Sequence, residues 1–131
     1  SEGVALNDIG ASNYFADINC LDLWGLANLE ISQKRRSGHF DSNDIRIACE
    51  KYNVKIAIVY DSWFFEENGS IIPSEWIKAG SWSISNNVIA GDDTISFYAI
   101  NTKESEILSL NLKQFSSQLP ETVLQSGKYL K

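Results

Sequence analysis

The chain has 131 residues, of which 44% are hydrophobic and 21% charged, and its formal net charge is −6. This composition is typical of one globular domain and excludes disordered and collagen-like chains. The acidic excess argues against nucleic-acid binding, because phosphates must be neutralised by a basic surface. No apolar run approaches the roughly 20 residues that cross a bilayer as a helix.

The sequence contains no methionine, so we expect it to be a processed or excised piece of a longer protein. We interpret residues 4–131 as a single α/β domain and residues 1–3 as an expression scar.

The first half of the chain predicts alternating strands and helices. Strands are expected at 4–6 and 20–24, a helical turn at 11–15, and helices at 28–36 and 43–52. The second of these helices follows from the spacing of its apolar residues, Ile45, Ala48, Cys49 and Tyr52. Residues 54–60 are apolar except for one lysine and rich in β-branched residues, a pattern typical of a central strand buried on both faces.

The second half is less regular. Asn68-Gly69 favours a turn over a glycosylation site, and Pro73 predicts the start of a helix. Short strands are expected at 82–84, 87–90 and 94–100, and a last amphipathic helix at 104–119. A helix followed by a buried strand is typical of a βαβ unit. We therefore predict an α/β fold with a mixed, mainly parallel sheet of four to five strands and helices on its faces.

Three acidic residues are associated with the predicted strands. Asp8 and Asp61 each follow an apolar strand, and ligands of open α/β sheets bind outside the carboxyl ends of the strands. If the two strands are parallel neighbours, the two carboxylates could work as an acid–base pair or bind a cation. The alternative is structural: Asp8 caps a helical turn and Asp61 starts a loop. Asp22 lies between Leu21 and Leu23, so it should point to the opposite face of its strand.

The residues that usually build metal or nucleophile sites are scarce. His39 is the only histidine, and neither it nor Cys20 or Cys49 has a partner at metal-ligand spacing. We therefore expect no metal and no cofactor, and two buried cysteines, with a disulfide between them as the alternative. The motifs of hydrolases, dinucleotide sites and phosphate loops do not occur.

Aromatic residues crowd the segment from Trp63 to Trp82. Such side chains could stack on sugar rings or dock a protein partner. Packing in the core is the alternative explanation.

Three short segments carry a resemblance to a known family: Asn7-Asp8-Ile9-Gly10-Ala11, Tyr14-Phe15 and Leu21-Asp22-Leu23-Trp24-Gly25-Leu26. They resemble the opening of the soluble carboxy-terminal domain of bacterial polytopic membrane glycosyltransferases, which use lipid-phosphate-linked sugars and include the dolichyl-phosphate-mannose mannosyltransferase-like enzymes. The resemblance is specific over residues 4–26, and the strand at 54–60 fits the same domain loosely.

The resemblance implies an extracytoplasmic domain of a membrane protein, in the periplasm or at the cell exterior, whose catalytic acids lie in membrane-side loops outside this chain. It implies an accessory, non-catalytic role in which the domain contacts the membrane-embedded portion of the same polypeptide and positions a glycan or lipid-linked sugar. Together with the residue patterns, it gives these ligand-binding positions: Asp8, Gly10, Asp22, Gly25, Asp61 and Trp63. Two alternatives remain, a small stand-alone enzyme built on Asp8 and Asp61, and a protein-interaction module built on the aromatic segment.

Overall fold

The structure is a computed structural model that describes residues 3–6, 19–23, 29–67, 69–84 and 93–131. Its main sheet has six strands: β1 (Gly3–Leu6), β2 (Asn19–Asp22), β3 (Val54–Val59), β6 (Ile77–Ile84), β7 (Thr94–Ala99) and β8 (Val123–Gly127). The described α-helices are α2 (Leu29–Arg36), α3 (Ser42–Lys51) and α4 (Thr102–Phe115). The shorter elements are the hairpin strands β4 (Phe65–Glu66) and β5 (Gly69–Ser70) and the 3-10 turns η1 (Asp61–Phe64), η2 (Ser116–Gln118) and η3 (Lys128–Leu130).

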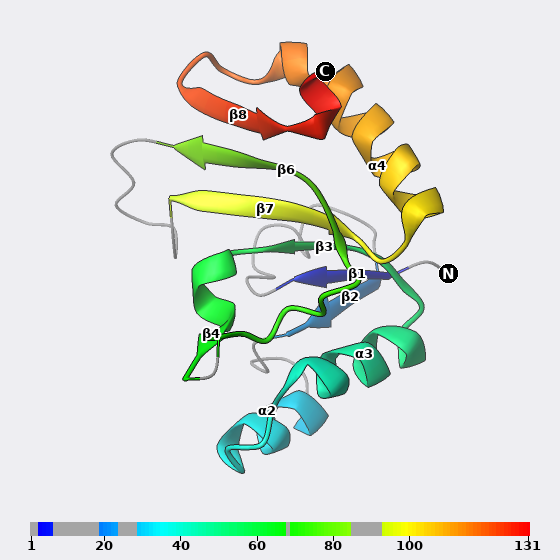
Figure 1. Ribbon diagram of the computed structural model, residues 1–131, viewed down its shortest axis with the longest axis vertical. Coiled ribbons are helices and arrows are strands. Elements are labelled where there is room, and N and C mark those ends of the chain that lie inside the picture. The colour runs from blue at the N-terminus through cyan, green and yellow to red at the C-terminus, as the bar shows by residue number, and fades with distance from the viewer. Residues whose placement is uncertain (1–2, 7–18, 24–28, 68, 85–92) are drawn as a thin grey trace.

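The sheet is mixed, with the strand order β2-β1-β3-β7-β6-β8 (Figure 1). β1 pairs in parallel with β2 and β3, whereas the other three strand pairs are antiparallel. The α/β class is confirmed, but the prediction of a mainly parallel sheet of four to five strands is wrong. Only the first three strands are parallel. β6, β7 and β8 form an antiparallel half, which needs no crossover helix between neighbouring strands.

Each face of the sheet carries its own hydrophobic core. On one side, which we call the α3 face, Ala57 and Val59 of β3 pack with Ile45 and Cys49 of α3. On the other side, the α4 face, Phe97 and Ala99 of β7 pack under α4, mainly against its buried leucines. Figure 1 shows α4 beside the antiparallel half of the sheet and α2 and α3 at the parallel half. The sheet is therefore covered by different helices on its two faces.

Helix α3 forms where the sequence predicts it. Asp41 caps its first turn: the Asp44 backbone N–H donates to Asp41 Oδ1 at 3.1 Å, and the Asp41 N–H donates to Asp44 Oδ2 at 3.0 Å. This reciprocal capping satisfies two amides that the helix itself leaves without partners. Ile45 and Cys49 are buried, as their spacing predicts.

Other expected elements differ from the structure. Pro73 starts no helix: the Trp76 N–H donates to the Pro73 carbonyl in a turn at 3.1 Å, and β6 begins at the next residue. The last helix ends at Phe115 rather than 119, and strand β8 was not expected. The expected elements at 11–15 and 87–90 lie outside the described residues. None of the helices in the described ranges is long and apolar enough to cross a membrane.

Candidate functional site

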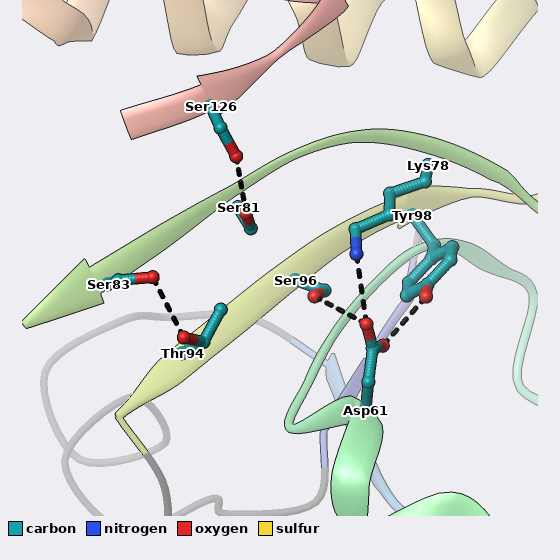
Figure 2. Close-up of polar contacts among 8 residues, drawn as sticks. All are labelled: Asp61, Lys78, Ser81, Ser83, Thr94, Ser96, Tyr98 and Ser126. Carbon is teal, nitrogen blue, oxygen red and sulfur yellow. Dashed lines mark hydrogen bonds and ion pairs between the residues drawn. The ribbon is translucent and has the colours of Figure 1, made fainter. Parts of the chain in front are cut away.

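The polar centre of the described structure is Asp61, which follows β3 and opens η1 (Figure 2). Its carboxylate accepts three hydrogen bonds. The Lys78 ammonium lies 3.0 Å from Oδ2, and the Ser96 hydroxyl donates to the same oxygen at 2.9 Å. The Tyr98 hydroxyl donates to Oδ1 at 2.7 Å. Both oxygens are thus held in place by donors from two neighbouring strands.

The strand register explains why these donors meet. β7 lies between β3 and β6, and Ser96 is opposite Val59 while Tyr98 is opposite both Ala57 and Lys78. Because directly opposed residues point to the same side of a sheet, all three donors lie on the α3 face. η1 continues from β3 over this face, which brings the carboxylate above β7.

The side chains of the cluster differ in their exposure to solvent. The Asp61 side chain is 32% exposed and that of Lys78 is 46% exposed, whereas Ser96 is fully buried. Burial raises the pKa of Tyr98, and its hydrogen bond to Asp61 raises this pKa further, so the phenol stays protonated as a donor. The carboxylate is paired with an ammonium and oriented by two hydroxyls. This arrangement suits a fixed hydrogen-bond acceptor with a donor beside it.

Aromatic rings flank the cluster. The Trp63 ring lies 5.2 Å from that of Tyr60 and is partly buried against the core of the α3 face. The Trp76 ring lies 6.0 Å from that of Tyr98. Trp82 points to the α4 face, where its ring contacts Phe97 and Phe115 with centroid distances of 4.6 and 6.1 Å. Trp76 and Trp82 therefore serve packing, whereas Trp63 belongs to the Asp61 loop.

Asp22 does not join this cluster. Asp22 of β2 is opposite Leu6 of β1, and Leu6 is in turn opposite Ile58 of β3, which packs against the core of the α4 face. Asp22 is therefore on the face of the sheet opposite to Asp61, and it is only 4% exposed. The expected orientation of Asp22 away from Leu21 is confirmed, since Leu21 lies in the core of the α3 face.

The remaining predicted positions Asp8, Gly10 and Gly25 lie outside the described residues, so the convergence of Asp8 with Asp61 stays a prediction. Lys78, Ser96 and Tyr98 are not among the positions that the sequence predicts for a ligand site. Alternation along β7, with polar residues at 96 and 98 and apolar residues at 97 and 99, was the available signal for two of them. The position of Lys78 depends on the register of β6 on β7, and the residues around Lys78 in the sequence give no indication of that register.

A second polar feature surrounds Arg35 in a hollow of about 440 Å³. The Arg35 Nε–H donates to the Leu23 carbonyl at 3.1 Å, and the guanidinium lies 4.4 Å from the centre of the Phe40 ring. Burial lowers the pKa of Arg35, against the opposing effects of Glu66 and Asp22. The hollow carries more acidic than basic side chains on its walls, so it does not resemble an anion site.

The expected burial of Cys49 is confirmed, whereas the expectation that the chain holds no metal stays a prediction. Cys49 is a free thiol buried in the core of the α3 face, and this burial raises its pKa to about 12. Across the described ranges, no three His, Cys, Asp or Glu side chains gather in a way that could hold a metal ion.

Comparison with known proteins gives a family but no activity. No curated protein and no solved structure matches the chain. One family model, described as a domain of unknown function (DUF8728), matches residues 1–98. The match contains the strands β1 to β3 and the whole Asp61 cluster, and it ends within β7, before α4 and β8. The chain therefore belongs to the DUF8728 family.

Proposed function

We propose that this chain is an accessory domain of a membrane glycosyltransferase that uses lipid-linked sugar donors, and that it positions a glycan or acceptor for the membrane-embedded part of the same polypeptide. In this proposal the domain lies on the extracytoplasmic side and the transfer chemistry takes place elsewhere in the parent protein. The resemblance of residues 4–26 to such enzymes supports the parent. The site at Asp61 supports the positioning role.

The observation that carries the positioning role is the arrangement of Asp61 between Lys78 and Tyr98. A sugar hydroxyl both donates and accepts hydrogen bonds, and a carboxylate beside an ammonium offers it one partner of each kind. Three donors already hold the carboxylate, so little side-chain entropy is lost when a ligand binds. Trp63 follows Asp61 by two residues in the same turn and adds an aromatic surface beside it.

The same arrangement favours positioning over acid–base catalysis. A general base has to accept a proton from its substrate, and both oxygens of Asp61 already accept hydrogen bonds from side chains of the protein. The stand-alone enzyme would need Asp8 in the same cleft as Asp61. The interaction module is less favoured, because Trp76 is 9% exposed and Trp82 packs between two phenylalanines.

The first test is the gene that encodes this chain. Several apolar spans of about 20 residues ahead of residue 4 are expected, whereas a start codon directly upstream would overturn the membrane parent.

The second test is activity. In membranes that contain the full-length protein, Asp61→Ala should slow sugar transfer from a lipid-linked donor, and Glu106→Ala, on the exposed surface of α4, should not. Sugar transfer catalysed by the isolated chain would overturn the accessory role.

A further inference from the structure

A row of hydroxyl side chains continues from Asp61 across the antiparallel half of the sheet (Figure 2). We call this row the hydroxyl face; its members are Ser81 and Ser83 of β6, Thr94 of β7 and Ser126 of β8, and the buried Ser96 of β7 links them to Asp61. The register places all of them on the α3 face, because Ser81 is opposite both Ser96 and Ser126, and Ser83 is opposite Thr94. The α4 face of the same strands is occupied by α4.

Hydrogen bonds between neighbouring hydroxyl groups hold the side chains of the hydroxyl face in place. Ser81 and Ser126 share a hydrogen bond of 2.8 Å, and so do Ser83 and Thr94. Each pair uses one donor and one acceptor, which leaves one hydrogen and further lone pairs for a ligand. Ser126 is exposed, and Ser81, Ser83 and Thr94 are partly exposed. Short side chains that are already bonded lose little rotamer freedom on binding.

The hydroxyl face also has a defined extent and charge. From β7 through β6 to β8 it spans two strand spacings, about 10 Å in total, which is comparable to two linked sugar rings. Its polar end carries Asp61 and Lys78, whose charges cancel at a separation of 3.0 Å. At the other end Leu124 of β8 lies opposite Ser83 and is 69% exposed, so it offers an apolar contact to the C–H groups of a sugar ring.

We propose that the hydroxyl face is the glycan-binding surface of this chain and that its ligand is a neutral oligosaccharide lying across β7, β6 and β8, with one sugar unit at Asp61 and Lys78. This inference rests on the proposed function and names its ligand class. A neutral glycan matches a surface on which the ion pair of Asp61 and Lys78 is internally balanced. An acidic glycan would meet the net charge of −6 on the chain, which repels it.

The test uses the whole chain with four probes: mannotriose, maltotriose, cellotriose and, as the acidic comparator, trigalacturonic acid. Binding is followed by saturation-transfer NMR and by amide chemical shifts. At least one neutral trisaccharide should bind, should shift amides of β6, β7 and β8, and should bind at least fivefold more tightly than the acidic one. Shifts confined to the Arg35 hollow, or tighter binding of the acidic trisaccharide, would overturn the proposal.

Variants then distinguish the loss of ligand contacts on the hydroxyl face from the loss of folding. The double variant Ser81→Ala with Ser126→Ala should weaken binding at least fivefold. Thr94→Val, which keeps the shape and removes the hydroxyl, should weaken it severalfold even if the double variant unfolds. Ser117→Ala, an exposed serine of η2 next to α4, should leave affinity unchanged. Unchanged affinity in Thr94→Val and in a folded double variant would overturn the assignment of the face.

The two proposals fail in different ways. If the isolated chain binds a neutral trisaccharide but the parent has no apolar spans, the membrane glycosyltransferase is excluded and the glycan-binding face remains. If no neutral trisaccharide binds but Asp61→Ala slows transfer in the full-length protein, the hydroxyl face is excluded and the accessory role remains.

Discussion

Gly80 of β6 and Gly127 of β8 lie opposite each other where the two strands meet, and neither position has space for a side chain. A β-carbon on Gly80 would lie 2.5 Å from the Ser126 carbonyl oxygen and 2.5 Å from the Tyr129 ring. A β-carbon on Gly127 would overlap the backbone of Ala79 and Gly80. This close approach joins β8 to the sheet and lets Tyr129 pack in the core under α4.

Gly127→Ala should therefore destabilise the fold by about 2–4 kcal/mol. Overpacking costs about 1–3 kcal/mol, and the φ of 134° at Gly127 adds backbone strain for any residue with a β-carbon. The measurement is urea unfolding followed by tryptophan fluorescence. Gly69→Ala is the matched control, because Gly69 also has a positive φ, 107°, but has nothing within 4 Å of the added carbon. Equal losses of unfolding free energy in the two variants would show that the close approach of β6 and β8 does not cause the destabilisation.

Asp61→Ala should lower the free energy of unfolding by about 1–3 kcal/mol. The substitution leaves the buried Ser96 hydroxyl and the half-buried Tyr98 hydroxyl without their acceptor. The ion pair with Lys78 contributes little of this loss because both side chains are about a third or more exposed to water. Asp61→Asn, which keeps one carbonyl acceptor, should lie between wild type and Asp61→Ala. A loss no larger than that of the surface control Glu106→Ala would contradict the central role of this carboxylate.

Tyr98 should make stability fall at alkaline pH. Its pKa is raised in the folded state by burial and by Asp61, so the unfolded chain releases this proton first, near pH 10. The stabilisation is complete below about pH 10 and is lost as the pH rises through the folded-state pKa, with a slope of about 1.4 kcal/mol per pH unit. In Tyr98→Phe this part of the slope should disappear. The measurement is the free energy of urea unfolding between pH 8 and 11. An identical pH dependence in wild type and Tyr98→Phe would contradict this contribution of Tyr98.

The parts of the fold that follow from the sequence are those with a local signal. β3 is a run of apolar and β-branched residues, and α3 shows buried Ile45 and Cys49 at helical spacing. The orientation of Asp22 follows from simple alternation along a strand. In each of these cases neighbours in sequence determine the pattern, so the prediction does not depend on how the strands are arranged.

The direction and pairing of the strands are not indicated by any local sequence pattern. The three donors to Asp61 lie 17, 35 and 37 residues away in sequence, and the registers of β7 on β3 and of β6 on β7 bring them together. β8 is short and carries serine and glycine, so its strand conformation depends on pairing with β6 rather than on propensity. Such tertiary effects decide both the antiparallel half of the sheet and the composition of the site.

Cys49 should resist alkylation until the chain unfolds. Burial in the core of the α3 face raises its pKa to about 12, whereas an unfolded cysteine titrates near pH 8.5. At pH 8 the reactive thiolate is therefore suppressed in the folded chain, and the sulfur is also shielded from the reagent. A pulse of iodoacetamide followed by tryptic mass mapping checks this on the peptide from Ile47 to Lys51, with 6 M urea as the unfolded reference. Labelling of this peptide at equal rates with and without urea would mean that α3 does not pack on the sheet as described.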